Sequence, residues 1–174
     1  MATWNVDAAH SDVQFKVKHL MINTVTGEFS SYRVTVESEK DDFSDAQISF
    51  EADIASISTK NDMRDGHLKS DDFFAAETYP TMSFTSTSFT PKGDGKFALT
   101  GDLTIRDVTK SVTLDAEYGG QMVDFYGNTK AGFELTGTIN RKEFGLAWDA
   151  VTEAGGIVVS DAVKLILNIQ LQKS

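Results

Sequence analysis

The sequence predicts an all-β fold of about eight antiparallel strands, arranged as a closed barrel or as a sandwich. Three observations predict it. Apolar and polar residues alternate along much of the 174-residue chain, short polar connections separate the alternating segments, and no long amphipathic helix is evident. Because no helix can cover the apolar side of such a sheet, the apolar faces of the strands must cover one another.

The expected strands repeat one pattern along the chain, with apolar residues at every second position. Their apolar positions, in chain order, are Val13, Phe15 and Val17; the run 29–36; Ile48, Phe50, Ala52 and Ile54; the run 82–89; Phe97, Leu99, Leu103 and Ile105; Val112, Leu114, Ala116 and Tyr118; the run 131–139; and Val163, Leu165, Leu167, Ile169 and Leu171. Only Ile166 departs from the alternation of the last strand. Residues 91–95, Pro-Lys-Gly-Asp-Gly, supply turn chemistry between two strands.

Gly101 and Gly137 occupy apolar positions of their strands. A missing side chain there costs packing, and it is usual at a bend, a bulge or a close approach of two segments. Two interpretations stay open: a bend that helps to close a barrel, or a gap filled by a large neighbour such as one of the 12 phenylalanines.

Two segments lack the strand pattern. Within 56–80, residues 59–62 are typical of the start of a capped short helix, and a second turn is expected at 72–76 before Pro80 ends the segment. The segment 141–160 carries three glycines. It is long for a connection, which is typical of a lid or a binding loop. We expect both segments to lie at the rim of an opening.

Composition excludes several classes of function. The chain has no cysteine, so it has no disulfide, no thiolate metal site and no cysteine nucleophile. Its 26 Asp and Glu against 16 Lys and Arg give a formal net charge of −10. That charge repels the phosphates of nucleic acids over about a Debye length, so no nucleic-acid partner is expected.

The sequence carries no segment typical of membrane insertion or secretion. No apolar run approaches the ~20 residues of a transmembrane helix, and a basic region followed by an apolar stretch does not occur at the amino terminus. We expect one domain over residues 1–174, without an integral membrane segment. The expected location is the cytoplasm, or the periplasm if a signal peptide has been removed.

Three histidines, His10, His19 and His67, raise a zinc hypothesis. If residues 10–19 are extended at ~3.3 Å per residue, His10 and His19 lie ~30 Å apart. Ligand nitrogens of one zinc ion lie within ~4 Å of each other, so only a sharp bend would allow a shared metal. No metal and no cofactor are expected. His19 continues the apolar phase of its strand, where it either meets a polar head group or closes the core through a hydrogen bond.

The expected short helix also carries acid and base side chains. Asp65 and His67 together suggest the alternative of a hydrolase or isomerase at the barrel mouth, with Arg64 and Ser70 nearby. Neither the G-x-S-x-G elbow of serine hydrolases nor the H-E-x-x-H helix of zinc proteases occurs in the sequence. Ion pairing and helix capping explain the same residues without catalysis.

Several sequence blocks resemble the YceI-like family. They are WNVDAAHSDVQFKVKHL (4–20), TVTGEF (24–29), SISTKNDMRDGHLKSDDFFAAETYP (56–80), GDLTIRDVTKSVTL (101–114) and GTINRKEFGLAWD (137–149). The blocks match in order and span nearly the whole chain. The resemblance implies an eight-stranded antiparallel lipocalin-like barrel with one or two short helices between strands 3 and 4. It also implies that an apolar pore binds polyisoprenoid chains, such as quinone tails or prenyl phosphates.

The leading hypothesis is therefore non-catalytic binding, storage or transport of a long-chain isoprenoid lipid inside the barrel. A tunnel of at least ~300 Å³ is expected for such a ligand. The resemblance carries over no catalytic residues, and it makes a homodimer a candidate assembly. The remaining alternative is a stress-related scaffold whose barrel is filled by its own side chains.

Two groups of residues are expected to contact the lipid. The tail is expected along an apolar pore formed by Val13, Phe15, Val17, Phe29, Ile48, Phe50, Ile54, Phe84, Leu99, Leu103, Leu114, Phe133, Leu135, Trp148, Leu165 and Leu167. The candidates for contact with the head group are His19, Arg64, His67, Lys69 and Arg141.

Overall fold

The computed structural model describes residues 2–19, 22–146 and 159–174, and within them eleven strands form one antiparallel sheet. The strands are β1 (Ala2–Val6), β2 (Asp12–His19), β3 (Asn23–Phe29), β4 (Tyr32–Ser38), β5 (Gln47–Asp53), β6 (Ile57–Ser58), β7 (Thr81–Gly93), β8 (Lys96–Ile105), β9 (Val108–Val123), β10 (Thr129–Asn140) and β11 (Val159–Lys173). The helical elements are the α-helix α1 (Asp62–Lys69) and the 3-10 helices η1 (Ala8–His10), η2 (Ile54–Ser56) and η3 (Arg141–Phe144).

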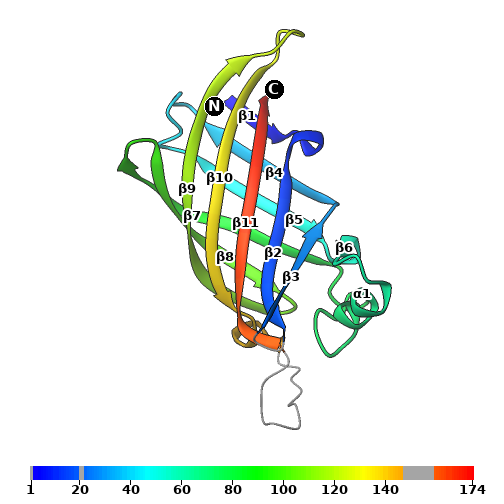
Figure 1. The fold of residues 1–174 in the computed structure, drawn as a ribbon. Coiled ribbons are helices and arrows are strands. Elements are labelled where there is room, and N and C mark those ends of the chain that lie inside the picture. Colours follow the sequence, from blue (N-terminus) through cyan, green and yellow to red (C-terminus); the bar gives the residue numbers. More distant parts are fainter. Residues whose placement is uncertain (1, 20–21, 147–158) are drawn as a thin grey trace.

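The sheet closes into a barrel (Figure 1). Its strands follow the order β1-β4-β5-β7-β8-β9-β10-β11, and β11 pairs again with β1, where Trp4 faces Lys173. The pairs β1 and β2, β3 and β4, and β5 and β6 are each successive parts of one chain path interrupted by a few residues. Counted by path in the described part of the chain, the barrel has the expected eight strands and is not a sandwich.

The interruption between β1 and β2 is fastened to the neighbouring strands. The Asp7 carboxylate accepts hydrogen bonds from Lys130 Nζ at 2.8 Å and from His10 Nδ1 at 2.9 Å. These bonds lower the pKa of Asp7 to about 2, the Lys130 bond having the larger effect. Nearby, Ser11 Oγ accepts a 2.9 Å hydrogen bond from the backbone N–H of Gln170. The bend is therefore held by β10 and β11.

The alternation predicted from sequence produces the inner wall of the barrel. On β8, for example, Phe97, Leu99, Leu103 and Ile105 are all buried. Two boundaries differ from the expectation. The first strand path begins with β1, which the alternation did not indicate, and the strand expected through Ile54 ends at Asp53, because the chain turns into η2 there.

Large neighbours fill the gaps at both glycines. A Cβ atom at Gly101 would overlap the ring of Phe84 and lie 2.5 Å from the carbonyl oxygen of Thr85. At Gly137, a Cβ atom would overlap the side chain of Leu114. The register of β7 and β8 also shifts opposite Gly101, so the filled gap coincides with an irregularity there.

The turn expected at residues 91–95 is confirmed. Asp94 and Gly95 have φ values of 55° and 75°, and they connect the paired ends of β7 and β8. Positive φ at both central residues is typical of a type I′ hairpin, whose twist matches that of the flanking strands.

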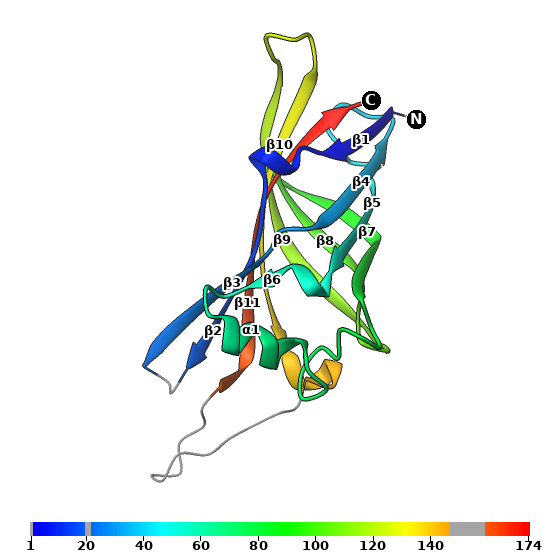
Figure 2. The same cartoon turned by 90° about the vertical axis from the view of Figure 1, so that its right-hand side faces the viewer.

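The two ends of the barrel are built differently (Figure 2). At one, here called the helix end, α1 begins after Asn61, whose side chain accepts a hydrogen bond from the N–H of Arg64. The second turn expected at 72–76 is present. The other end carries both termini and the long β9–β10 hairpin and is here called the plug end. In the described residues, no helix is long and apolar enough to cross a membrane.

Candidate ligand-binding cavity

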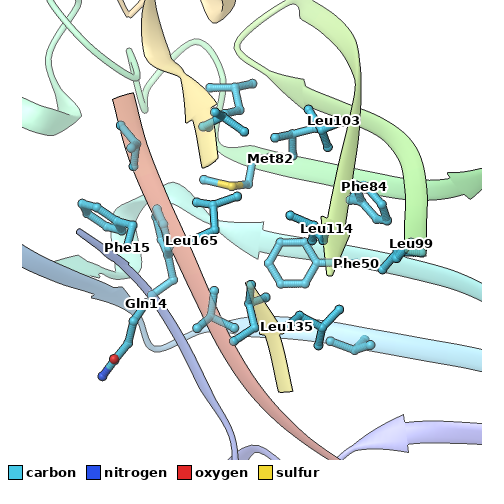
Figure 3. Close-up of a pocket in the computed structure, with 18 of the residues that line it drawn as sticks. Gln14, Phe15, Phe50, Met82, Phe84, Leu99, Leu103, Leu114, Leu135 and Leu165 are labelled. Carbon is cyan, nitrogen blue, oxygen red and sulfur yellow. The ribbon is translucent and has the colours of Figure 1, made fainter. Parts of the chain in front are cut away.

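An apolar cavity of about 200 Å³ lies inside the barrel (Figure 3). Among the described residues that line it, only Gln14 and Arg141 have polar side chains. In Figure 3, the Gln14 side chain points away from the apolar group formed by Phe50, Leu114 and Leu165. The cavity therefore offers almost no hydrogen-bonding partner along its length, and it suits a hydrocarbon better than a polar molecule.

The expected pore residues face this cavity with two exceptions. Fourteen of the sixteen expected residues line the cavity, and all fourteen lie on strands. Several further wall residues, which the sequence analysis did not assign to the pore, also lie on strands. Ile54 is buried on η2 and is not part of the wall. Trp148 lies outside the described residues.

The expected pore residues that line the wall are Val13, Phe15, Val17, Phe29, Ile48, Phe50, Phe84, Leu99, Leu103, Leu114, Phe133, Leu135, Leu165 and Leu167.

Sequence reasoning missed wall residues of two kinds. Some, such as Val163 and Leu171, belong to recognised strands and have the inward phase, so the period of two could have assigned them to the wall. Others, such as Phe43, Phe73 and Phe74, come from connecting segments. No periodicity marks these, and their only signal is an aromatic residue within a polar stretch.

Phe43 closes the plug end of the cavity. Its side chain is 1% exposed, and its ring centroid lies 5.1 Å from those of Trp4 and Phe133 and 5.5 Å from that of Tyr118. Its backbone has a φ of 62°, in the left-handed region that non-glycine residues rarely adopt. Phe43 therefore has a strained backbone conformation while its ring packs in this aromatic cluster.

The loop that carries Phe43 is fastened by Asp45. The Asp45 carboxylate accepts hydrogen bonds from Ser38 Oγ at 2.6 Å and from the backbone N–H groups of Glu39 and Lys40 at 2.9 and 3.2 Å. These bonds, that of Ser38 first, lower the pKa of Asp45 to about 2. Asp45, which follows Phe43 in the chain, is thus bound to residues that precede Phe43, and these bonds hold the loop at the end of β4.

Arg141 brings a buried positive charge to the helix end. The side chain is 3% exposed in total, Nε donates to Ser160 O at 2.9 Å, and Nη2 donates to Val159 O at 3.3 Å. The guanidinium carbon lies 6.0 Å from the ring centroid of Phe73, within the range of a cation–π contact. Backbone carbonyls, an aromatic face and the Asp161 carboxylate, 3.9 Å from Nη2, therefore stabilise a charge that borders an apolar cavity.

The other head-group candidates lie on the same end but do not line the cavity. Arg64 donates from Nε and Nη2 to Thr59 at 2.7 and 2.8 Å, and His67 Nε2 lies 2.9 Å from Asp72 Oδ2. His19 and Lys69 are half-buried and are also absent from the wall. Of the five candidates, Arg141 is the one that borders the cavity in the described part of the chain.

Asp65 and His67 have different partners in the structure. The Asp65 carboxylate is buried and accepts hydrogen bonds from the backbone N–H and Oγ1 of Thr59 at 2.8 and 2.6 Å. It fastens α1 to the segment that follows β6. The residues described here contain no group of three or more metal-ligating side chains placed to share an ion.

The cavity is smaller than the ~300 Å³ expected from the sequence. An apolar cavity of ~150 Å³ can hold one benzene molecule, so about 200 Å³ has room for on the order of eight carbons. Several side chains that bound it, including Phe50, Leu135 and Leu165, are only half-buried although they face inward. A longer chain would need these side chains to change rotamer.

The sequence matches a family model and known relatives over most of its length. The model of the YceI-like domain matches residues 4–171. A UPF0312 protein of Staphylococcus aureus is 37% identical over 165 residues, which cover 94% of each chain.

Solved structures share the barrel. A YceI protein of Campylobacter jejuni is 37% identical, with a TM-score of 0.77 over 97% of this chain and 96% of that one. BcnA of Burkholderia cenocepacia has a TM-score of 0.83 at 24% identity, over 95% of this chain and 98% of that one. A polyisoprenoid binding domain from Saccharophagus degradans has a TM-score of 0.72 at 15% identity, over 98% of each chain. The last two show a common fold.

Proposed function

Because this chain belongs to the YceI-like family, we propose that it binds an isoprenoid lipid inside its barrel without catalysing a reaction. The observation that supports this most directly is the wall of the cavity, which is apolar apart from Gln14 and Arg141. The fold shared with a domain named for polyisoprenoid binding agrees with the proposal. Storage or transport of the lipid is the role that such a site would serve.

Burial of a complete tail would supply enough energy for tight binding. At ~0.8 kcal/mol per buried methylene, a tail of about forty carbons has a gross burial energy on the order of 30 kcal/mol. The ligand-efficiency trend of ~0.3 kcal/mol per atom leaves about 12 kcal/mol after the costs of ordering. Since the cavity holds only part of such a tail, binding would require the inward side chains to move apart or the rest of the tail to leave through one end.

Arg141 favours a head group at the helix end. It is the head-group candidate that borders the cavity, and its charge would attract a phosphate or a quinone oxygen. Farnesyl diphosphate should then bind more tightly than farnesol, and added salt should reduce the difference. Equal affinities at low salt would contradict the placement of the head group but not the binding of the tail.

Extraction of the purified protein tests the proposal directly. We expect organic solvent to release an isoprenoid that mass spectrometry identifies, or the emptied protein to bind added prenyl lipids. Absence of both would overturn the proposal.

A matched pair of variants tests whether the tail lies in the cavity. Leu165 lines the cavity, whereas its neighbour Ile166 has the opposite phase on β11 and is not part of the wall. Leu165→Trp should fill part of the void and weaken prenol binding by about tenfold or more, whereas Ile166→Trp should leave binding nearly unchanged. An equal loss in both variants would place the lipid elsewhere.

The hydrolase or isomerase alternative makes a different prediction. His67 contacts Asp72, and the Asp65 carboxylate is used by Thr59, so no contact of the described residues favours an acid–base pair of Asp65 and His67. His67→Ala should therefore leave lipid retention unchanged. Loss of a measurable turnover in this variant, by ~10²-fold or more, would support the enzyme instead.

A further inference from the structure

The β9–β10 hairpin extends beyond the rest of the barrel at the plug end (Figure 2). Its apex, residues 122–128, is here called the hairpin tip. Four large apolar side chains of the tip are exposed: Met122 by 68%, Val123 by 62%, Phe125 by 105% and Tyr126 by 90%. Single exposed apolar residues are ordinary on a protein surface, but a group at one projecting apex marks a site of interaction.

The backbone of the hairpin tip is held by its own hydrogen bonds. Asp124 Oδ1 accepts from the backbone N–H groups of Tyr126 and Asn128 at 2.9 and 3.0 Å, and Asp124 N–H donates to Asn128 O at 2.9 Å. The bond from Asn128 lowers the pKa of Asp124 most. The turn therefore presents Phe125 and Tyr126 outward in a defined conformation, and its one carboxylate is engaged within the turn.

Size and shape favour a lipid surface over a second copy of the chain. The two fully exposed aromatic side chains offer roughly 300–500 Å², and Met122 and Val123 add less because they are smaller and only about two-thirds exposed. A stable protein interface needs about 800 Å² from each partner. The tip is also convex, so a protein partner would need a matching groove. A bilayer deforms around such a tip, and aromatic side chains accumulate at the boundary between the lipid head groups and the acyl chains.

Charge restricts the kind of lipid. Residues 119–129 contain no lysine or arginine, and the whole chain has a formal net charge of −10. Interfacial binding to anionic membranes depends on basic residues, which are absent here. The tip therefore suits a zwitterionic surface, and an anionic one should repel the protein.

We propose that the hairpin tip inserts Phe125 and Tyr126 into the interface of a zwitterionic lipid bilayer. Docking in this way turns the plug end toward the membrane. Gln121 Nε2, below the tip, donates a 2.9 Å hydrogen bond to Asp41 O in the loop that carries Phe43, so the loop closing the cavity lies beside the docking site. The proposal does not depend on which molecule the barrel holds.

Sedimentation with vesicles tests the docking. Protein at fixed concentration is mixed with sucrose-loaded phosphatidylcholine vesicles, and the bound fraction is measured against lipid concentration. The double variant Phe125→Ser and Tyr126→Ser should lower the partition coefficient by at least about tenfold, because each side chain loses its apolar contact with lipid. Replacing a third of the lipid by phosphatidylglycerol should lower binding of the unmodified protein.

Met63→Ser is the matched control. Met63 is 88% exposed on α1 at the helix end, so its loss should not change the partition coefficient. Both variants alter exposed side chains, and their thermal unfolding should match that of the unmodified protein. No vesicle binding, unchanged binding of the double variant, or an equal loss in Met63→Ser would overturn the proposal. A dimer in sedimentation velocity that the double variant converts to a monomer would assign the tip to contact between copies and also overturn it.

Discussion

Three glycines on the inner wall help to keep the barrel hollow. Gly27, Gly101 and Gly137 lie beneath Phe15, Phe84 and Leu114, and a Cβ atom at each position would overlap the side chain above it. The large side chains therefore lie against the wall of a neighbouring strand. If the glycines were larger residues, the same side chains would be pushed toward the centre and would occupy the volume available to a ligand.

Gly101→Ala should test this arrangement. We expect the free energy of unfolding to fall by about 1–3 kcal/mol, because the new Cβ atom meets both Phe84 and the backbone oxygen of Thr85. Urea unfolding measures the change. Gly66→Ala is the control: a Cβ atom there meets nothing within 4 Å, and the exposed helical position should gain about 0.5–1 kcal/mol. Equal effects of the two substitutions would contradict the close approach at Gly101.

Asp7 makes stability depend on acid pH. Its folded-state pKa of about 2 lies below the ordinary value of 3.8, chiefly because of the hydrogen bond from Lys130 and then that from His10. A lowered pKa stabilises the fold above about pH 4, and this contribution disappears as the pH falls through 2. The shift corresponds to at most roughly 2.5 kcal/mol.

Lys130→Met should remove most of this acid-dependent contribution. Between pH 5 and pH 2, unfolding followed by circular dichroism should show a smaller loss of stability in the variant than in the unmodified protein. Lys92→Met is the control, because Lys92 and Asp115 form an exposed pair 3.6 Å apart whose contribution is small. A variant with the same pH profile as the unmodified protein would show that Lys130 does not set the pKa of Asp7.

Among the elements, the loop between β4 and β5 closes the plug end through one side chain. Phe43→Ala should lower the free energy of unfolding by about 3–5 kcal/mol, because the ring leaves a void between Trp4, Tyr118 and Phe133. Phe125→Ala deletes the same side chain at a fully exposed site and should change stability by less than about 0.5 kcal/mol. Denaturant unfolding measures the change in the free energy of unfolding for both variants. An equally small change in Phe43→Ala would mean that the Phe43 ring is not packed in the core.

Strand positions were predictable from the sequence, whereas the plug was not. Alternation along β5, β8 and β11 assigned Phe50, Leu99 and Leu165 to one side because the period of a strand fixes which side chains share a face. Phe43 enters the core from a loop, where side-chain direction depends on tertiary hydrogen bonds such as those of Asp45. Local sequence carries no information about these bonds.

The same limit applies to the polar candidates. Residue type grouped Arg64, His67 and Arg141 as head-group candidates, but only the folded chain shows that Thr59 and Asp72 engage the first two. Arg141 borders the cavity because η3 follows directly on β10 and turns its side chain inward beneath Phe73. Its burial could not be read from the polar character of the segment.

At the scale of the whole molecule, closure makes the barrel and its cavity one cooperative unit. β11 contacts β10 on one side and both β1 and β2 on the other, so it joins the first and last parts of the chain. The cavity is lined by inward residues from most of the strands, so a ligand inside it would touch many strands at once. Binding should therefore stabilise the complete barrel rather than a single segment.

If the barrel holds the proposed isoprenoid, removal of that lipid should lower the melting temperature. A ligand present at one hundred times its dissociation constant adds about 2.7 kcal/mol to the folded state. For a chain of this size, 1 kcal/mol corresponds to roughly 2–4 °C, so delipidated protein should melt about 5–10 °C lower and recover when prenol is added. Leu165→Trp, with part of the cavity filled, should respond little to added prenol, whereas Ile166→Trp should respond like the unmodified protein. Scanning calorimetry measures all three, and a melting temperature independent of prenol in the unmodified protein would mean that the barrel does not hold this ligand.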